Sequence, residues 1–511
     1  MAEQRHGMIS RRQLLKWGGI AAVGSLSTLV MACGGGSSTA TVAPATAAPS
    51  TGGASSTAPS VAPTTAATRA ATASTAPSGA SGTAVGAGTP SASGAAVGAY
   101  QQRTNVQGSV LFWHFWGSPV RRNAIRRVIG EFNAVYPSIK VEETYVPFGD
   151  IYTRLLAAVA AGSGMPDVIV EDRAQLRARA ANQIDNGLGT LAKRDNITGD
   201  AYWPFTWTES VANGEPFGLP YETDIRVLYY SKAALADAGF DPEKPPTNWD
   251  ELKAYADKID QKDGDKLVRV AFYPTEGNIG LDTWAWCNGG EWQTNDNTPT
   301  INRPENVAAL TWMKTWTDRY GKSAYDAFKG TFGQGNQDSF MSGKVAMKVD
   351  IQGYTSQLNF YNPKFNTKDG KDLGYGVAAI PPAPGQKPAS FSGGFAMSNP
   401  RGSKNQEQAW EFAKYMSFVG QAGWARDTYA MPTVEKLART DPSLNAVPNW
   451  KFFVDAMGYG RPSVYNPNFP TMMGDVVGPA FDDVSTRNRT PQQALDDAQK
   501  KAEQEIAKNK R

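Results

Sequence analysis

Most side chains in this sequence that could do chemistry are aromatic rings, carboxylates and arginines. The chain has 14 Trp but only two His and two Cys. Beyond residue 100 the single histidine is His114 and the single cysteine is Cys287. An internal disulfide needs two Cys, and zinc sites draw several ligands from Cys and His. We therefore predict no catalytic residue, no metal site and no cofactor, and we interpret Cys287 as a buried thiol.

Ionisable side chains gather at two places along the chain. Glu171, Asp172 and Arg173 follow a short apolar stretch, and Glu222 and Asp224 lie in the segment Gly214–Trp249. A carboxylate or an arginine can bridge two neighbouring hydroxyls of a sugar, while flat aromatic rings cover its C–H faces. These residue types fit a carbohydrate site. The same acids would also fit an exported glycoside hydrolase or lyase, which needs two carboxyls about 5–9.5 Å apart.

The charge distribution argues against nucleic acid as a partner. The formal net charge is +3, from 51 basic and 48 acidic residues. Residues 1–99 hold five basic residues and one acid, so residues 100–511 are left at −1. A nucleic-acid-binding domain needs a basic surplus in its folded part.

The first hundred residues are expected to be an export signal followed by a tether. Residues 1–33 carry Ser10-Arg11-Arg12-Gln13-Leu14-Leu15-Lys16 before a short apolar stretch, which resembles a twin-arginine signal peptide. Val30-Met31-Ala32-Cys33 resembles a lipobox, in which Cys33 is lipidated. Residues 34–105 are mostly Ala, Thr, Ser, Pro and Gly, a composition that favours disorder. We expect a lipid-anchored protein on the extracytoplasmic face of the cell membrane.

Alternating strands and helices must position the candidate residues. Val110–Trp116, Ile139–Tyr145 and Asp167–Val170 are predicted strands, separated by two helices with apolar residues at helical spacing. This order predicts an α/β fold with a parallel, doubly wound sheet, whose ligand edge lies at the carboxyl ends of the strands. Those ends carry Trp116, Phe148 and the group from Glu171 to Arg173.

Several ordered motifs resemble one protein family. Gly218-Leu219-Pro220-Tyr221, Leu228-Tyr229-Tyr230-Ser231-Lys232, Pro245-Pro246-Thr247-Asn248-Trp249, Phe340–Met347 with Gly353-Tyr354, and Met431-Pro432-Thr433 occur in that order. They resemble the extracellular solute-binding proteins of ABC importers, in the family that includes the maltose and other sugar-binding proteins. The resemblance covers about Val106 to the C-terminus. Ser231 stands where Asn is usual, and Tyr354 where a sugar-stacking Trp is usual.

The resemblance implies a two-lobed periplasmic-binding-protein fold of the type II kind. Each lobe would hold a mostly parallel doubly wound sheet with flanking helices, and hinge crossovers would join the lobes. Lobe I is then expected at residues 106–222 and 394–440, and lobe II at residues 223–393 and 441–511. The crossovers would lie near Glu222–Asp224, near Phe391–Gly394 and near residue 440, with Gly393 and Gly394 suited to a hinge strand.

The resemblance also implies a set of ligand-binding residues on both lobes. On lobe I these are Trp116, Phe148, Glu171, Asp172, Arg173, Tyr221 and Glu222. On lobe II they are Asp224, Trp284, Trp286 and Tyr354, with Gly393 and Gly394 at the hinge. Of the two neighbouring tryptophans we favour Trp284 over Trp286. We expect Trp116→Ala and Trp284→Ala to weaken binding without unfolding the protein.

The expected function is therefore that of a monomeric receptor. It would capture a mono- or oligosaccharide by lobe closure and deliver it to the permease subunits of an ABC importer. Two alternatives remain open at this point. One is an exported carbohydrate-active enzyme, and the other is the same fold binding a non-sugar solute such as a glycerol phosphate ester, a polyamine or a peptide.

Overall fold

The computed structural model describes residues 101–363 and 374–509. The predicted signal, the tether up to residue 100 and Cys33 lie outside the described residues. The described chain forms a mixed α/β fold with two main sheets, of six and three strands. We call the part built on the six-stranded sheet lobe I and the part built on the three-stranded sheet lobe II.

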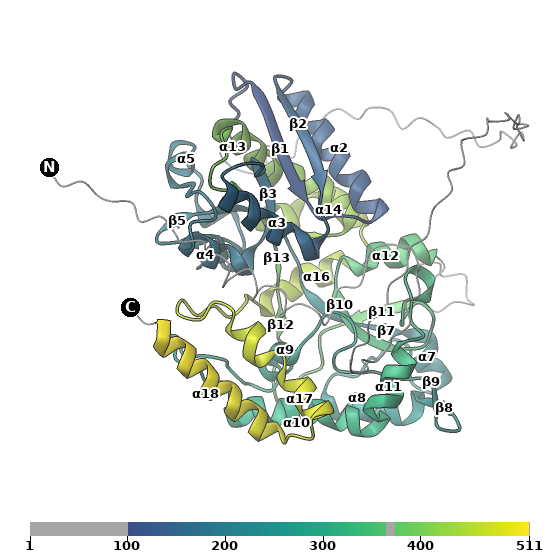
Figure 1. Ribbon diagram of the computed structural model, residues 1–511. Helices are drawn as coiled ribbons and strands as arrows, with labels where there is room; N and C mark the ends of the chain where they lie inside the picture. The colour runs from purple at the N-terminus through teal and green to yellow at the C-terminus, as the bar shows by residue number, and fades with distance from the viewer. Residues whose placement is uncertain (1–100, 364–373, 510–511) are drawn as a thin grey trace, which may run out of the picture. The chain divides into compact units, whose positions relative to one another are not determined.

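The sheet of lobe I begins as the sequence predicted and then changes direction. β1 (Gly108–His114) lies between β2 (Ile139–Tyr145) and β3 (Val168–Asp172), and pairs in parallel with both. β13 (Gly394–Ser398) adds antiparallel to β3 and is followed by β6 (Gly218–Thr223) and β14 (Met431–Pro432), also antiparallel. Figure 1 shows β1 and β2 side by side, with α2 along them. The parallel part brings the carboxyl ends of β1, β2 and β3 to one edge.

Nine α-helices surround this sheet. They are α2 (Pro119–Val135), α3 (Phe148–Ala161), α4 (Arg173–Ala181), α5 (Gly189–Arg194), α6 (Pro204–Ser210), α13 (Gln406–Tyr415), α14 (Gln421–Thr428), α15 (Glu435–Thr440) and α16 (Trp450–Ala456), all within the described residues. A two-stranded hairpin joins β4 (Val211–Ala212) to β5 (Glu215–Pro216). Local sequence signals set two helix boundaries. Ser118 caps the start of α2, and Gly162 ends α3 in the left-handed conformation.

The sheet of lobe II differs from the mostly parallel arrangement that we expected. β7 (Arg226–Ser231) lies between β10 (Met347–Ile351) and β11 (Tyr375–Ala378) and is antiparallel to both. Parallel pairing is limited to single bridges of Val270 with Val345 and of Gly277 with Val349. The reason is that β10 and β11 both enter the sheet from the end at which β7 leaves it. The fold class is confirmed, but the doubly wound parallel pattern applies to β1, β2 and β3.

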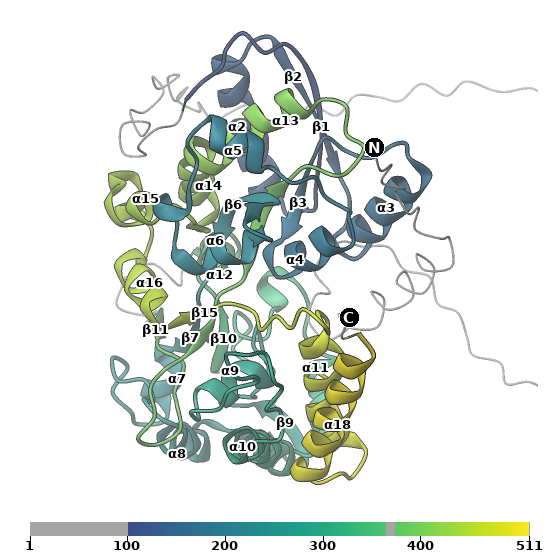
Figure 2. The ribbon, with the colours of Figure 1, turned by 90° about the vertical axis from the view of Figure 1, so that its left-hand side faces the viewer.

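The helices of lobe II pack around its own core, and Figure 2 shows α9 above α10 and α18 to its right. They are α7 (Lys232–Asp237), α8 (Trp249–Ile259), α9 (Leu281–Trp286), α10 (Pro304–Tyr320), α11 (Lys322–Lys329), α12 (Tyr354–Tyr361), α17 (Ala480–Thr486) and α18 (Pro491–Asn509). A hairpin pairs β8 (Gln261–Asp263) with β9 (Lys266–Arg269). Thr490 and Gln493 form a capping box at the start of α18. In the part of the chain that the structure describes, no helix has the length and apolar composition to span a membrane.

Two large hydrophobic clusters fill the described residues, and the first reaches from lobe I into lobe II through Val227, Tyr229 and Tyr354. The first contains the apolar faces of β1, β3 and β6, and the second contains the side chains of α8, α9, α10 and α18. Residues from Leu444 to Met457 also belong to this first cluster. β15 (Gly460–Arg461) then pairs in parallel with β12 (Ser390–Phe391), and we call the segment that follows β15 the third crossover.

The first described residues are held firmly against lobe I. The ammonium group of Lys414, which is fully buried on α13, donates to the carbonyl of Gln101 at 2.9 Å. Asp195 and Glu411 pair with the same ammonium at 2.6 and 2.9 Å. The backbone N–H of Arg103 donates to Glu411. A buried lysine needs such partners, so this N-terminal arm is part of a satisfied polar network.

Candidate functional site

Three chain segments connect the lobes, and polar contacts tie them together. The first runs from β6 to β7 through Glu222–Asp224, the second from β12 to β13 through Ser392 and Gly393, and the third follows β15. The hydroxyl of Thr223 donates to the carbonyl of Gly393 at 2.9 Å, and the N–H of Gly393 donates to Asp224 at 3.0 Å. The first two segments therefore move as a unit.

Gly394 is required at the hinge for steric reasons. Its φ is +127°, in the region that favours glycine. A Cβ atom there would lie 2.2 Å from the carbonyl oxygen of Glu222 and 2.4 Å from the guanidinium of Arg173. Gly393 is tighter than average but does not exclude a side chain, because its Cβ would lie 3.1 Å from Asp224. The two glycines thus occupy the hinge that we predicted, and Gly394 permits the close approach of the two crossover strands.

Arg173 is a hinge residue in this structure, which corrects its prediction as a solute contact. It is 1% exposed at the start of α4. Its guanidinium donates to the carbonyl of Glu222 at 2.5 Å, to the hydroxyl of Thr223 at 3.2 Å and to the carbonyl of Gly393 at 2.5 Å. Its Nε donates to Glu209 at 3.1 Å. These partners use the donors that would otherwise bind a solute.

The acids at the end of β3 are also committed to structure. Glu171 is fully buried, and its carboxylate lies 2.9 Å from the Nε atom of Arg179. Burial raises the pKa of Glu171 well above its ordinary value, although Arg179 opposes the rise. Asp172 caps α4 by accepting from the N–H of Ala174, and burial raises its pKa to about 6. Only Asp172 keeps part of its surface exposed.

Trp116 lies inside an aromatic cluster of lobe I rather than at a surface. It is 1% exposed, and its ring centroid lies 4.3 Å from that of Trp424 and 5.6 Å from that of Tyr221. Trp424 donates its indole N–H to the carboxylate of Glu222, which is 4% exposed. Burial raises the pKa of Glu222. The predicted site residues Trp116, Tyr221 and Glu222 therefore come together, but they pack against each other.

Half-exposed aromatic rings stand beside the hinge. Phe148, which we predicted as a site residue, contacts Phe115 and Tyr152 with centroid distances of 4.9 and 5.7 Å. Phe395 follows Gly394 and lies 4.7 Å from Phe115. Phe148, Phe115 and Phe395 are all partly exposed. They offer an apolar surface at the carboxyl end of β1, where the parallel strands place the ligand edge.

Asp224 and Arg226 occupy the opposite side of the same hinge. The guanidinium of Arg226 pairs with Asp224 at 2.6 Å and also donates to the carbonyl of Phe391 at 2.9 Å. It lies 4.2 Å from the centroid of the Phe391 ring, which is partly exposed. Asp224 keeps 16% of its side chain exposed. Of the predicted acids, Asp224 is therefore one that combines exposure with a position at the hinge.

A cavity of about 480 Å³ lies beside the third crossover. We call it the Trp286 cavity. Its walls come from α4, from the end of α9 with the loop after it, and from the segment after β15. The lining residues are Arg177, Trp286, Glu291, Trp292, Gln293, Thr294, Asn295, Asn297, Arg461, Pro462, Ser463, Val464 and Tyr465. Its size suits a small solute.

Stacked rings and charged groups alternate in this cavity. The guanidinium of Arg461 lies 5.4 Å from the centroid of Trp286 and pairs with Glu291 at 2.7 Å. The guanidinium of Arg177 lies 4.5 Å from the centroid of Tyr465. Arginine–aromatic stacking of this kind leaves several N–H donors facing outward. The amide oxygen of Gln293 is buried without a hydrogen-bond partner. The cavity therefore offers both ring faces and polar groups.

The two neighbouring tryptophans are both buried, Trp284 at 0% and Trp286 at 5% exposure, but their surroundings differ. Trp284 is fully buried in the core of lobe II, where its indole N–H donates to the carbonyl of Pro274 at 2.7 Å. Trp286 instead borders the cavity. Tyr354 is also in the interior, because its hydroxyl donates to Asp338 and its ring lies 4.2 Å from the ammonium of Lys348. Both Trp284 and Tyr354 are therefore held by partners within lobe II.

Sequence reasoning missed Arg177, Glu291, Arg461 and Tyr465. The sequence signal for Glu291 was the run Gly289-Gly290-Glu291-Trp292, which begins three residues after Trp286. Arg461 and Tyr465 had no signal, because no motif that we identified in the sequence covers them. Arg177 follows Arg173 by one helical turn, so it could have been placed near the hinge from the period of α4.

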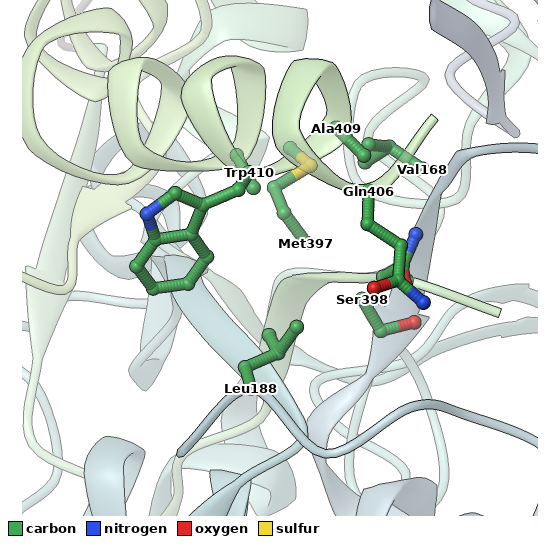
Figure 3. A pocket seen from close by; sticks show the side chains of 9 residues that line it. Val168, Leu188, Met397, Ser398, Gln406, Ala409 and Trp410 are labelled. Carbon is green, nitrogen blue, oxygen red and sulfur yellow. The ribbon is translucent and has the colours of Figure 1, made fainter. Parts of the chain in front are cut away.

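Other candidate groups are outside any site. Cys287 is buried, its thiol donates to the carbonyl of Ala389, and burial raises its pKa to about 12. A second cavity, of about 10 Å³, lies in the core of lobe I and holds at most one water. Figure 3 shows Trp410, Met397 and Leu188 around it. Among the described residues, no group of three or more His, Cys, Asp or Glu could hold a metal ion.

Comparisons with known proteins agree with this arrangement. The family model described as "Bacterial extracellular solute-binding protein" matches residues 117–422. A Deinococcus radiodurans protein named "Probable ABC transporter-binding protein" is 26% identical over 310 residues, which are 58% of this chain and 70% of that protein. The sn-glycerol-3-phosphate-binding periplasmic protein UgpB of Shigella dysenteriae serotype 1 is 24% identical over 429 residues, 78% of this chain and 92% of its own.

A solved structure extends the likeness to the fold. The structure of CpMnBP1 with mannobiose bound is 24% identical and covers 78% of this chain and all of its own chain. Its TM-score of 0.69 is that of a shared fold. The two chains therefore share the two-lobed fold.

Proposed function

Because the chain belongs to the bacterial extracellular solute-binding proteins, it serves an ABC transporter, and we propose that its solute is a carbohydrate. The observation that carries the proposal is the Trp286 cavity, where Arg461 stacks on one ring and pairs with Glu291. A sugar ring would pack against the aromatic surface with its C–H groups. Its hydroxyls would exchange hydrogen bonds with the guanidinium and carboxylate.

The hinge supplies the second half of the proposed site. Phe148, Phe115 and Phe395 are partly exposed on lobe I, and Asp224 is partly exposed on the lobe II side of the first crossover. We propose that an oligosaccharide extends from the Trp286 cavity toward these rings. Lobe closure would then remove its hydroxyls from water and pair them with side chains from both lobes, delivering the closed receptor to the permease subunits.

A glycerol phosphate ester is the second candidate solute. Within the described residues Arg177 forms no ion pair with a carboxylate. It lines the cavity, and its guanidinium could bind phosphate. UgpB, whose name states that it binds sn-glycerol-3-phosphate, is a relative. Glu291 weakens this candidate, since its carboxylate would repel a phosphate at the same cavity.

The experiment compares neutral and anionic solutes directly. Purified protein is screened by thermal shift with mannobiose, maltose and sn-glycerol 3-phosphate, and each hit is titrated by calorimetry. A solute that binds only the folded state raises the melting temperature. Stoichiometric binding of a saccharide with no effect of the phosphate ester supports the proposal. Binding of the phosphate ester alone would replace it with the second candidate.

We also propose that the protein is a receptor and not an enzyme. The same saccharides are incubated with the protein for a day at a substrate excess and analysed by chromatography. Bound saccharide recovered intact supports a transport role. Products accumulating beyond one equivalent of protein would identify a glycoside hydrolase or lyase.

The proposed location follows from the sequence before the described residues. We propose export through the twin-arginine-like signal, lipidation at Cys33, and a monomeric domain held at the extracytoplasmic face of the membrane by the segment to residue 105. Mass spectrometry of the membrane fraction should detect an acylated N-terminal Cys33. A Cys33→Ala variant should be released from that fraction, and retention of the variant would contradict the anchor.

A further inference from the structure

One buried ion pair contacts all three segments that connect the lobes. The pair is Arg173 of α4 with Glu209 of α6, whose side chains are 1% and 2% exposed. Arg173 binds the first crossover at Glu222 and Thr223 and the second crossover at Gly393.

Glu209 extends the same network to the third crossover. One carboxylate oxygen accepts from Nε of Arg173 at 3.1 Å. The other accepts from both the backbone N–H and the hydroxyl of Ser463, each at 3.0 Å. Ser463 also lines the Trp286 cavity, two residues after Arg461. A continuous set of charge-assisted hydrogen bonds therefore runs from the cavity wall to the other two crossovers.

We propose that the Arg173–Glu209 pair couples the three crossovers, so that a solute that moves the segment after β15 shifts the other two hinge strands with it. This proposal rests on the lobe closure of the proposed function. Glu209 and Arg173 are then positioning residues, because neither needs to touch the solute. Charged hydrogen bonds in a dry interior have strict geometry, which makes such a pair able to transmit displacement.

The alternative is that the pair merely stabilises lobe I. Position argues against a purely local role, since α4 and α6 could bury apolar side chains at this point at lower cost. The backbone groups bound by the pair at Glu222, Gly393 and Ser463 belong to different crossovers, separated by more than a hundred residues in the sequence for the first two. A local stabiliser needs only one of them.

The test is hydrogen–deuterium exchange of the solute-free full chain. Glu209→Gln keeps an acceptor for Ser463 but removes the charge from the pair. We expect exchange to become about tenfold faster in peptides covering all three crossovers, residues 222–225, 391–394 and 460–463, which corresponds to about 1.4 kcal/mol. Ser463→Ala, which alters only the third crossover, should raise exchange about threefold at all three. Exchange that changes only next to the substituted contact would overturn the proposal.

Glu411→Gln is the matched control. Glu411 is also a fully buried carboxylate of lobe I, and it pairs with Lys414 at 2.9 Å away from the crossovers. It should raise exchange in the N-terminal arm and α13 while leaving the crossovers unchanged. An equal rise at the crossovers would mean general destabilisation and would overturn the proposal. If Glu209→Gln does not fold, Ser463→Ala alone carries the test, because it removes a hydroxyl contact of Glu209 at the third crossover and no contact at the other two.

The measurement does not need a solute. A protein that bound no saccharide would contradict the proposed function but would leave the exchange pattern of the crossovers to be read. A protein that bound saccharide tightly with uncoupled crossovers would contradict only the coupling. The two proposals can therefore fail separately.

Discussion

Two arginine–glutamate pairs lie near the hinge and differ mainly in burial. The side chains of Arg173 and Glu209 are 1% and 2% exposed, whereas those of Arg461 and Glu291 are 39% and 46% exposed. The buried arginine donates to backbone carbonyls and a hydroxyl of the crossovers. The exposed arginine lies over Trp286 at the cavity. The comparison teaches that the residue types of a sugar site also build a hinge, and that burial decides between the two uses.

The largest effect should come from breaking the buried pair. We expect Arg173→Met to lower the free energy of unfolding by about 3–5 kcal/mol, because Glu209 is left as an uncompensated buried charge. Urea denaturation followed by circular dichroism measures it. Arg461→Met is the matched variant at the exposed pair and should cost less than about 1 kcal/mol. Equal losses for the two variants would refute the distinction.

The two neighbouring tryptophans extend the comparison to aromatic side chains. Trp284→Ala should destabilise the protein by about 3–5 kcal/mol, since it leaves a cavity in the core of lobe II. The same loss is expected for Trp116→Ala, in place of the weakened binding that we predicted from the sequence. Melting temperatures of both variants test this, and wild-type stability in either one would show that its ring is not packed as described.

Trp286→Leu should weaken binding and also lower stability, because the ring borders the cavity yet is only 5% exposed. We expect the affinity for the saccharide found in the thermal-shift screen to fall by about 2 kcal/mol, roughly 30-fold, because the stacking surface is lost. Calorimetry at fixed temperature measures the change. Trp312→Leu, on α10 and away from the cavity, is the control and should leave affinity unchanged. An unaltered affinity in Trp286→Leu would remove the cavity from the binding site.

The smallest expected effect concerns pH and a third buried group of lobe I. Burial raises the pKa of Asp185 to about 6, while Arg179 and the hydroxyl of Ser398 oppose the rise. Between about pH 4 and 6 the folded protein therefore holds a proton more tightly than the unfolded chain. The resulting stability is present below about pH 4 and is lost as the pH rises through 6. Asp185→Asn should make the fall in stability between pH 5 and 7 smaller by about 1 kcal/mol. An unchanged slope in urea titrations would show that Asp185 titrates normally.

The sequence predicted the positions of the first strands better than the surroundings of side chains. Strand positions depend on local patterns, so strands are present close to the three predicted ranges, as β1, β2 and β3. The burial of Trp284 depends on a helix further along the chain, because its ring packs against Trp312 of α10. The donors of Arg173 are likewise used by segments about 50 and 220 residues away.

The antiparallel sheet of lobe II illustrates the same limit. The apolar runs that form β7 and β10 are short, and hydrophobic periodicity carries no information on strand direction. Only the path of the chain between them sets it. The expected boundary near residue 440 stays a prediction, because Leu444 to Met457 belong to a hydrophobic cluster with members in both lobes.

The contact between Lys414 and Gln101 has a mechanical consequence. Any pull on the chain that precedes Gln101 is transmitted first to α13, through the buried ammonium and its two carboxylate partners. The load therefore enters lobe I and bypasses the crossovers. Under the membrane anchor proposed above, we expect lobe I to be the lobe that is held and lobe II to be the one that moves relative to it on closure.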